Sequence, residues 1–144
     1  LPGNTPQIDN DLQQGEIITG IELPDEDFSE NFSYLKIRER SSYAFALISV
    51  ATAFKTENNL ITEARIALGG VSHKPWRNFD AEEYLKGKPT TEEHFNRAAD
   101  IILADARAFQ HNEFKIKLAK KAIIRNCRMA LDKSSHRVGA KPSL

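Results

Sequence analysis

Cysteine is almost absent from this sequence of 144 residues, and the single one, Cys127, excludes an internal disulfide and a cysteine-based metal site. The four histidines (His73, His94, His111 and His136) form no pair at the spacing of metal ligands, so a metal centre is not expected. Long apolar runs are missing too, since none approaches the roughly 20 residues of a membrane-spanning helix. What remains is the composition of one globular domain, with 40% hydrophobic and 28% charged residues.

Known patterns of nucleotide-binding and catalytic residues are also missing. Gly69 and Gly70 follow an apolar run, but neither the phosphate-loop pattern G-x-x-x-x-G-K-[ST] nor the dinucleotide pattern G-x-G-x-x-G occurs. We therefore expect the two glycines to allow a turn or a close backbone approach. No Ser-His-Asp arrangement is visible, and Cys127 falls on the inner side of an expected helix, where a small core residue is typical. The isolated chain is therefore expected to be non-catalytic.

Charges balance overall but are unevenly placed. The chain has 20 basic and 20 acidic residues. Residues 1–32 carry eight acidic groups and no Lys or Arg, whereas residues 110–144 carry nine basic groups and two acidic ones. This asymmetry indicates two surfaces with different partners, or one end of the fold packing on the other.

Four segments with the alternation of β-strands follow an irregular lead-in over residues 1–14. They cover residues 15–24, 32–40, 44–54 and 60–70. The third segment has apolar side chains on both of its alternating faces, which predicts a central strand covered on both sides. The fourth has an expected inner face of Leu60, Thr62, Ala64, Ile66 and Leu68. The intervening KTENN is a plausible hairpin turn, because asparagine tolerates the left-handed conformation.

The first two predicted strands present a second, partly apolar face. In the first, Ile17, Thr19, Ile21 and Leu23 alternate with Ile18, which points the other way. In the second, Tyr34, Lys36 and Arg38 lie opposite Leu35 and Ile37. An outer surface with Ile18, Tyr34 and Lys36 is suited to cover a planar, electron-rich ligand or a partner domain.

The second half of the chain has helical periodicity and predicts about three helices. The first runs from its N-cap Asp80 to Gly87, and the second covers residues 90–109. The third begins after its cap Asn112 and ends near Lys133. Strands followed by helices predict an α+β fold, in which the helices pack on one face of an antiparallel sheet of three to four strands.

The third predicted helix has a basic face, which consists of Lys117, Lys121, Arg125 and Arg128. Four cations on one face are suited to nucleic-acid phosphates. The sequence pI of about 7.1 and the lack of interleaved aromatic residues favour instead a solvated or partner-facing surface. The acidic N-terminal segment is a possible complement within the chain.

Four stretches in order carry a resemblance to a known family. They read LPGNTPQIDNDLQQGEIITGIELP, YLKIRERSSYAFALISVA, ARIALGGVSHKPWR and HNEFKIKLAKKAIIRN. From Leu1 to about Leu131 the chain resembles the C-terminal end of FAD-binding medium subunits of the xanthine dehydrogenase, aldehyde oxidoreductase and carbon monoxide dehydrogenase type. The resemblance implies a CO dehydrogenase flavoprotein C-terminal-like domain over residues 1–132. The sequence of the remaining residues 133–144 predicts a disordered tail.

The resemblance implies membership of a molybdenum hydroxylase, an oxidoreductase complex. In such enzymes electrons pass from a molybdenum cofactor through iron–sulfur clusters to FAD, and then to NAD, oxygen or another acceptor. The implied role is to close the flavin site and to dock partner subunits. The implied partners are an N-terminal FAD-binding domain, an iron–sulfur small subunit and a molybdenum-cofactor large subunit, without nucleic acid or membrane.

The resemblance also implies two flavin contacts, from Ile18 and Lys36. An aliphatic group packs near the edge of the isoalloxazine ring, and a cation near its carbonyls favours the anionic reduced form. The family's phosphate-binding loops belong to the missing N-terminal domain, so FAD is expected to be shared with that domain. The alternative is a scaffold or interaction module, derived from the same domain, that has no flavin contact.

We find no signal peptide, which favours a cytoplasmic location. The first residue is Leu rather than Met, which indicates a fragment or a processed chain, and the periplasm is the alternative location.

Overall fold

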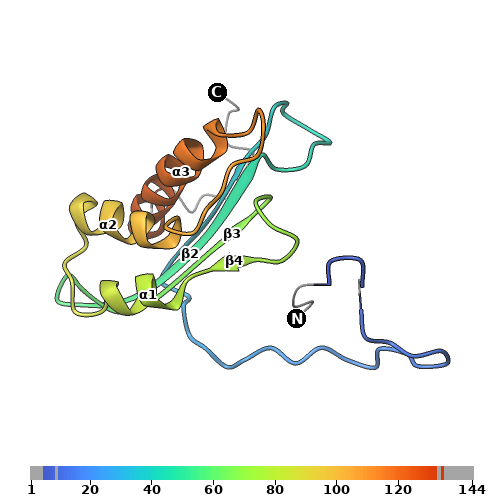
Figure 1. Ribbon diagram of the computed structural model, residues 1–144. Coiled ribbons are helices and arrows are strands. Elements are labelled where there is room, and N and C mark those ends of the chain that lie inside the picture. Colours follow the sequence, from blue (N-terminus) through green and yellow to red (C-terminus); the bar gives the residue numbers. More distant parts are fainter. Residues whose placement is uncertain (1–4, 9, 133, 135–144) are drawn as a thin grey trace.

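The computed structural model describes residues 5–8, 10–132 and 134 (Figure 1). A four-stranded antiparallel sheet in the order β1-β2-β3-β4 precedes three helices, which confirms the predicted α+β class. The strands are β1 Asn31–Ile37, β2 Ile48–Glu57, β3 Leu60–Gly69 and β4 Trp76–Arg77. The helices are α1 Phe79–Leu85, α2 Glu92–Ile102 and α3 Phe114–Leu131. Except for Ser134, the predicted tail over residues 133–144 lies outside the described residues.

The predicted strand over residues 15–24 is wrong. This segment carries no strand, and it runs away from the sheet as an exposed chain (Figure 1). Its residues alternate as a strand would, but no neighbouring strand of this chain supplies the hydrogen bonds that a sheet requires. The fourth strand is instead the short β4, which pairs with the end of β3.

The second strand is central, between β1 and β3, but it is covered on one side only. Ile48, Val50 and Phe54 are buried beneath the helices, whereas Ala51 on the opposite face is exposed. The prediction of cover on both sides is therefore wrong, because all three helices lie on one face of the sheet (Figure 1). The strand also begins later than predicted, so that residues 44–47 lie in the loop before it.

The hairpin between β2 and β3 turns at Asn58 and Asn59, whose φ angles are 50° and 64°. This confirms the predicted turn, since asparagine adopts the left-handed region at low cost. A β-bulge follows, because Lys55 pairs with Glu63 while Thr56 pairs with Ile61. The extra residue shifts the alternation, so the core receives Ile61 rather than the predicted Leu60 and Thr62.

The core lies between the sheet and the helices. Phe54 of β2 stacks on Phe95 of α2, with ring centroids 5.9 Å apart. α2 turns Phe95, Ala98, Ala99 and Ile102 into this core, where all four are buried. α3 covers β1 and β2 and buries Ala119, Ala122, Ile123, Asn126, Cys127 and Ala130.

The helix ends differ from the predictions in detail. α1 is capped by Asn78, whose side chain accepts a hydrogen bond from the Ala81 N–H, and not by Asp80. α2 ends at Ile102, well before the predicted residue 109. Before α3, the Asn112 side chain accepts from the Phe109 N–H, so this side chain closes the preceding loop instead of capping the helix. Short polar side chains that lie next to each other compete for such caps, and sequence alone does not rank them.

Candidate functional site

The uncovered side of the sheet, which we call the outer face, holds a flat surface of small side chains. Antiparallel pairing aligns Tyr34 of β1 with Ala51 of β2, and Ala51 with Ala67 of β3. The next row aligns Lys36 with Ser49, and Ser49 with Gly69. Side chains aligned in this way share one face of the sheet. We call the four small residues the shelf: Ser49, Ala51, Ala67 and Gly69.

Gly69, which has no side chain, forms the end of the shelf. A Cβ atom at Gly69 would lie 2.6 Å from the Ser49 Oγ, so a larger residue would displace the neighbouring side chain. At the rim of the shelf, Tyr34 is 64% exposed and Phe32 is 49% exposed. The predicted outward orientation of Tyr34 and Lys36 is therefore confirmed. The result is a level floor with an aromatic ring and a cation along one side.

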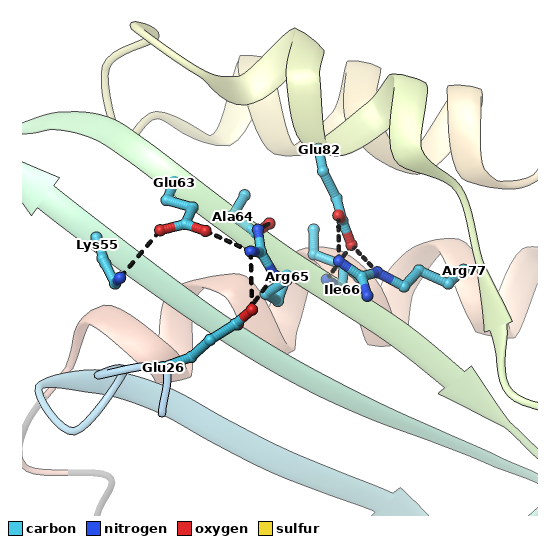
Figure 2. A network of polar contacts seen from close by, with 8 residues as sticks. All are labelled: Glu26, Lys55, Glu63, Ala64, Arg65, Ile66, Arg77 and Glu82. Atoms are coloured by element: carbon cyan, nitrogen blue, oxygen red, sulfur yellow. Dashed lines mark hydrogen bonds and ion pairs between the residues drawn. The ribbon is translucent and has the colours of Figure 1, made fainter. Parts of the chain in front are cut away.

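A network of charges lies on the outer face beside the shelf (Figure 2). The Lys55 Nζ lies 3.0 Å from the Glu63 Oε2, and Arg65 contacts both Glu63 and Glu26. The hydrogen bond from Lys55, assisted by Arg65, lowers the pKa of the Glu63 carboxyl below its ordinary value. The Phe28 ring lies under Lys55, with the Nζ 4.8 Å from the ring centroid. These contacts hold residues 26–28 against the sheet.

The acidic N-terminal segment therefore meets the sheet and not the basic face of α3. The contact is between Glu26 and Arg65, with 3.4 Å between Oε2 and Nε. On α3, Arg128 pairs with Glu92 of α2 at 3.2 Å. Within the described residues, no acidic side chain pairs with Lys117, Lys121 or Arg125. The prediction of an exposed basic face is thus confirmed. The suggestion that the acidic N-terminal segment pairs with this face is wrong.

The two predicted flavin contacts lie in different parts of the chain. Lys36 stands at the rim of the shelf, and no acidic side chain among the described residues pairs with it. Ile18 is 70% exposed and belongs to the N-terminal segment that leaves the sheet (Figure 1). The chain alone therefore does not bring Ile18 and Lys36 into one site. The sequence prediction had placed both on one sheet, which requires the strand that does not form.

The shelf fits one side of a planar ring system such as the flavin of FAD. A flat floor, a neighbouring aromatic side chain and a cation suit a ring that carries polar carbonyl groups. The described residues offer no glycine-rich phosphate loop, so they fit the ring and not the phosphates of such a cofactor.

A second polar cluster, missed by the sequence analysis, closes the other edge of β3 (Figure 2). Glu82 of α1 is buried, and its Oε1 accepts hydrogen bonds from the Ile66 N–H at 3.0 Å and from the Arg77 Nε at 2.7 Å. A second bond joins Arg77 Nη2 to Glu82 Oε2. This paired contact raises the pKa of Arg77 further above its ordinary value. Both carboxylate oxygens are engaged, which indicates a structural role.

The glycine corner after β3 is structural, as predicted. Gly70 has a φ of +76°, and a Cβ atom there would lie 2.9 Å from the Ala46 carbonyl oxygen. Its own carbonyl oxygen accepts a hydrogen bond from the Lys115 Nζ at 2.8 Å. Gly70 thus permits both a left-handed turn and a close backbone approach, and its carbonyl connects the corner to α3.

Cys127 is a core residue, as predicted. It is fully buried, and burial raises the pKa of its thiol to about 12. Among the described residues, no group of three His, Cys, Asp or Glu side chains is placed to hold a metal ion. No helix in the same part of the chain has the length and apolar character needed to cross a membrane.

The sequence matches the model of the CO dehydrogenase flavoprotein C-terminal domain over residues 33–130. It is 38% identical over 122 residues to the aldehyde oxidoreductase FAD-binding subunit PaoB of Escherichia coli K12, covering 85% of this chain and 35% of that protein. It is 37% identical over 78 residues to the glyceraldehyde dehydrogenase medium chain of Sulfolobus acidocaldarius, covering 54% of this chain and 27% of that protein. The chain spans about a third of the length of the first relative and about a quarter of the second.

Solved structures share the fold. Quinoline 2-oxidoreductase from Pseudomonas putida 86 superposes with a TM-score of 0.65 at 23% identity, over 74% of this chain and 38% of that chain. Carbon monoxide dehydrogenase from Hydrogenophaga pseudoflava gives a TM-score of 0.64 at 24% identity, over 69% of this chain and 36% of that chain.

Proposed function

Because this chain belongs to the CO dehydrogenase flavoprotein C-terminal domain family, we propose that it closes one side of the flavin site in a molybdenum hydroxylase. The curated relatives are an FAD-binding subunit and a medium chain of oxidoreductases, and this chain corresponds to one domain of such a subunit. The flavin phosphates would be held by a separate FAD-binding domain, which accounts for the lack of a phosphate loop here. Molybdenum and iron–sulfur centres would belong to partner subunits.

The shelf is the observation that carries this proposal. Two adjacent rows of the outer face have Ser49, Ala51, Ala67 and Gly69 beside Tyr34 and Lys36, and Arg77 of β4 lies beyond Ala67, where Glu82 holds its side chain. A planar ring on that floor would exclude water from the shelf and would place its polar edge near Lys36.

Bound FAD would accept electrons from the metal centres and pass them to an acceptor. The chain's own contribution is electrostatic and steric. The Lys36 ammonium would stabilise negative charge on the polar edge of a bound ring. Tyr34 and the shelf would exclude water from one side, and Ile18 would contribute an aliphatic contact once its segment is docked.

Two other surfaces support subunit docking as part of the same function. The loop between β1 and β2 carries Tyr43 and Phe45, which are 95% and 99% exposed. Exposed aromatic side chains are typical of the buried centre of protein interfaces. The basic face of α3 offers a surface for an acidic region of the molybdenum or iron–sulfur subunit.

The test is Lys36→Met in the assembled complex. Loss of the cation removes stabilisation of the reduced, anionic flavin, so the flavin midpoint potential should fall by about 20 mV or more, which corresponds to about 1 kcal/mol for a two-electron couple. Spectroelectrochemistry of the flavin absorbance measures this potential. Lys86→Met is the matched control, because Lys86 is an exposed residue directly after α1 whose ammonium makes only a 3.9 Å contact with Glu83.

The alternative function is a scaffold without flavin contact. Under that hypothesis Lys36→Met leaves flavin content, midpoint potential and electron-transfer rate as in the Lys86→Met control. That result would reject the flavin-site proposal and favour the scaffold.

A further inference from the structure

A cavity lies where β4, the loop after α2 and the start of α3 meet. Its volume is about 100 Å³, and we call it the corner pocket. Ala119 at one end of the lining is buried and Arg107 at the other is exposed, so the pocket runs from the core to the surface. Most of its wall is apolar and includes Val71, Trp76, Leu103, Ala106, Ile116 and Ala119.

The polar side chains of the corner pocket are hydrogen-bond donors. They are Arg107, Asn112 and Lys115, and no acidic side chain of the described residues lines the pocket. The Asn112 Oδ1 already accepts from the Phe109 N–H, which leaves the Asn112 amide N–H groups to donate. Lys115 uses one of its donors on the Gly70 carbonyl oxygen. Arg107 makes no hydrogen bond or ion pair with another residue of the described part of the chain. Donors without a matching acceptor select an anion.

The walls of the corner pocket are fixed by contacts within the chain. The Trp76 Nε1 donates a hydrogen bond to the Ile102 carbonyl oxygen at 2.8 Å, which holds the indole against the end of α2. The bond from the Lys115 Nζ to the Gly70 carbonyl oxygen, also 2.8 Å long, joins α3 to the corner after β3. A site that is formed in advance loses little conformational freedom when a ligand binds.

The corner pocket and the shelf lie on opposite sides of the sheet. Trp76 aligns with Leu68, which is buried in the core, whereas Arg77 aligns with Ala67 of the shelf. Neighbouring residues of a strand point to opposite faces, so the indole of Trp76 lies on the helix side. A ligand in the pocket would not touch a flavin on the shelf, and either site can exist without the other.

We propose that the corner pocket binds a short-chain carboxylate, the anion of a free aliphatic acid. The size of the ligand follows from the volume of the pocket, because an engineered cavity of about 150 Å³ admits benzene and this one is smaller, which suits an acid of about three to five carbons. The apolar wall favours an aliphatic body over an inorganic anion, whose oxygens would lose water there without gaining partners. The Arg107 guanidinium presents paired N–H groups that match the two oxygens of a carboxylate.

Trp76 is the only tryptophan of the chain, so its fluorescence reports on the corner pocket directly. Titration of the chain with sodium butyrate, with sodium chloride added to hold the ionic strength constant, should give a saturable change with a Kd of about 1 mM or tighter. Two further probes divide the ligand into its parts. 1-Butanol lacks the charge and inorganic phosphate lacks the aliphatic body, so each should bind at least about tenfold more weakly than butyrate.

Variants of the lining residues locate the site. Arg107→Gln removes the guanidinium and should raise the Kd for butyrate about tenfold or more. Arg97→Gln is the matched control, because Arg97 is an exposed arginine of α2 outside the pocket, and it should leave the Kd within about twofold. Ala106→Leu adds bulk to the wall and should abolish saturable binding. Thermal unfolding of each variant checks that the fold is intact.

Three outcomes would overturn the proposal. They are a lack of saturation with butyrate, an equal response to 1-butanol or phosphate, and an unchanged Kd in Arg107→Gln. Calorimetric titration of the assembled complex distinguishes a free acid from a carboxylate of a partner chain, since butyrate that binds the isolated chain but not the complex would show that a partner occupies the pocket and would overturn the free ligand. Lys36→Met should bind butyrate as the unaltered chain does, so the flavin proposal stands or falls separately.

Discussion

Asn126 is a polar residue at the centre of the packing between α3 and the sheet. It is fully buried, and its Nδ2 lies 3.0 Å from the Ser33 and Val50 carbonyl oxygens and 2.9 Å from the Thr52 Oγ1. One amide thus joins α3 to both β1 and β2. Buried carbonyls that lose their donor are costly, so this contact fixes the position of the helix on the sheet.

Replacement of Asn126 by alanine should lower the free energy of unfolding by about 2–3 kcal/mol, because it removes buried hydrogen bonds to Ser33, Val50 and Thr52 and opens a small cavity. Urea unfolding followed by circular dichroism measures the change. Arg125→Ala alters the neighbouring exposed residue and should stay within about 0.5 kcal/mol. Equal stability of the two variants would contradict the role of Asn126.

Cys127 should be inert toward alkylation in the folded chain. Burial raises the pKa of its thiol to about 12, so almost no thiolate exists at pH 8 and the reagent has no access. Mass spectrometry should detect no iodoacetamide adduct in native protein after a time that labels the urea-unfolded chain completely. A raised thiol pKa also means that its contribution to stability is present below pH 9 and declines as the pH rises toward 12. Rapid native labelling at pH 8 would show that this part of the core opens.

Alternation predicts single residues well where it reports only which face they occupy. Strand alternation correctly predicted that Tyr34 and Lys36 point outward. Helical periodicity correctly predicted that Cys127 points inward. It gave no sign of buried Asn126 or Glu82, since polar side chains are placed in a core by partners far away in the chain. Asn126 bonds to Ser33, 93 residues earlier, and this pairing has no local signature.

At the scale of elements, local turn chemistry was predictable and strand pairing was not. The asparagine pair at Asn58 and Asn59 and the glycine corner at Gly70 form as their residue types indicate. The segment 15–24 has the same alternation as β1 but forms no strand, because a strand depends on a neighbour. The bulge beyond Lys55 also depends on strand pairing. Because of it, Ile61 is buried in the core, where Leu60 was predicted.

Gly70→Ala should be the most destabilising of three glycine substitutions. Gly70 has a positive φ, and a Cβ atom there would lie 2.9 Å from the Ala46 carbonyl oxygen. Gly87 has a positive φ of 73° but no atom within 4 Å of such a Cβ. Gly20 has neither a positive φ nor a close atom. We expect losses of about 2–4, 1–2 and less than 0.5 kcal/mol, respectively. Thermal unfolding of the three variants gives the order, and a Gly70→Ala variant as stable as Gly87→Ala would remove the argument for a close approach.

On the scale of the whole molecule, the core and the proposed ligand surface lie on opposite sides of one sheet. The fold class and the basic face of α3 were predictable, since amphipathic periodicity records which side is buried. The shelf was not, because it arises from the register that aligns small residues of β2 and β3 with Tyr34 and Lys36. Ile18 and Lys36 came from the resemblance, and their place in a flavin site stays a prediction.

The isolated chain should not bind FAD in stoichiometric amount. It offers one side of a ring site and no phosphate loop among its described residues, and most of the affinity for a dinucleotide comes from phosphate contacts. The visible absorbance of oxidised flavin, measured after incubation with FAD and gel filtration, tests this. A one-to-one flavin spectrum would contradict a shared site.

Residues 16–23, with the sequence EIITGIEL, lie exposed outside any strand or helix, and this form has a consequence for how the polypeptide is cut. Proteases bind their substrates as extended strands, and uncovered segments are the preferred sites of cleavage. Mild proteolysis should therefore cleave first within EIITGIEL and leave the sheet and its helices as a resistant fragment.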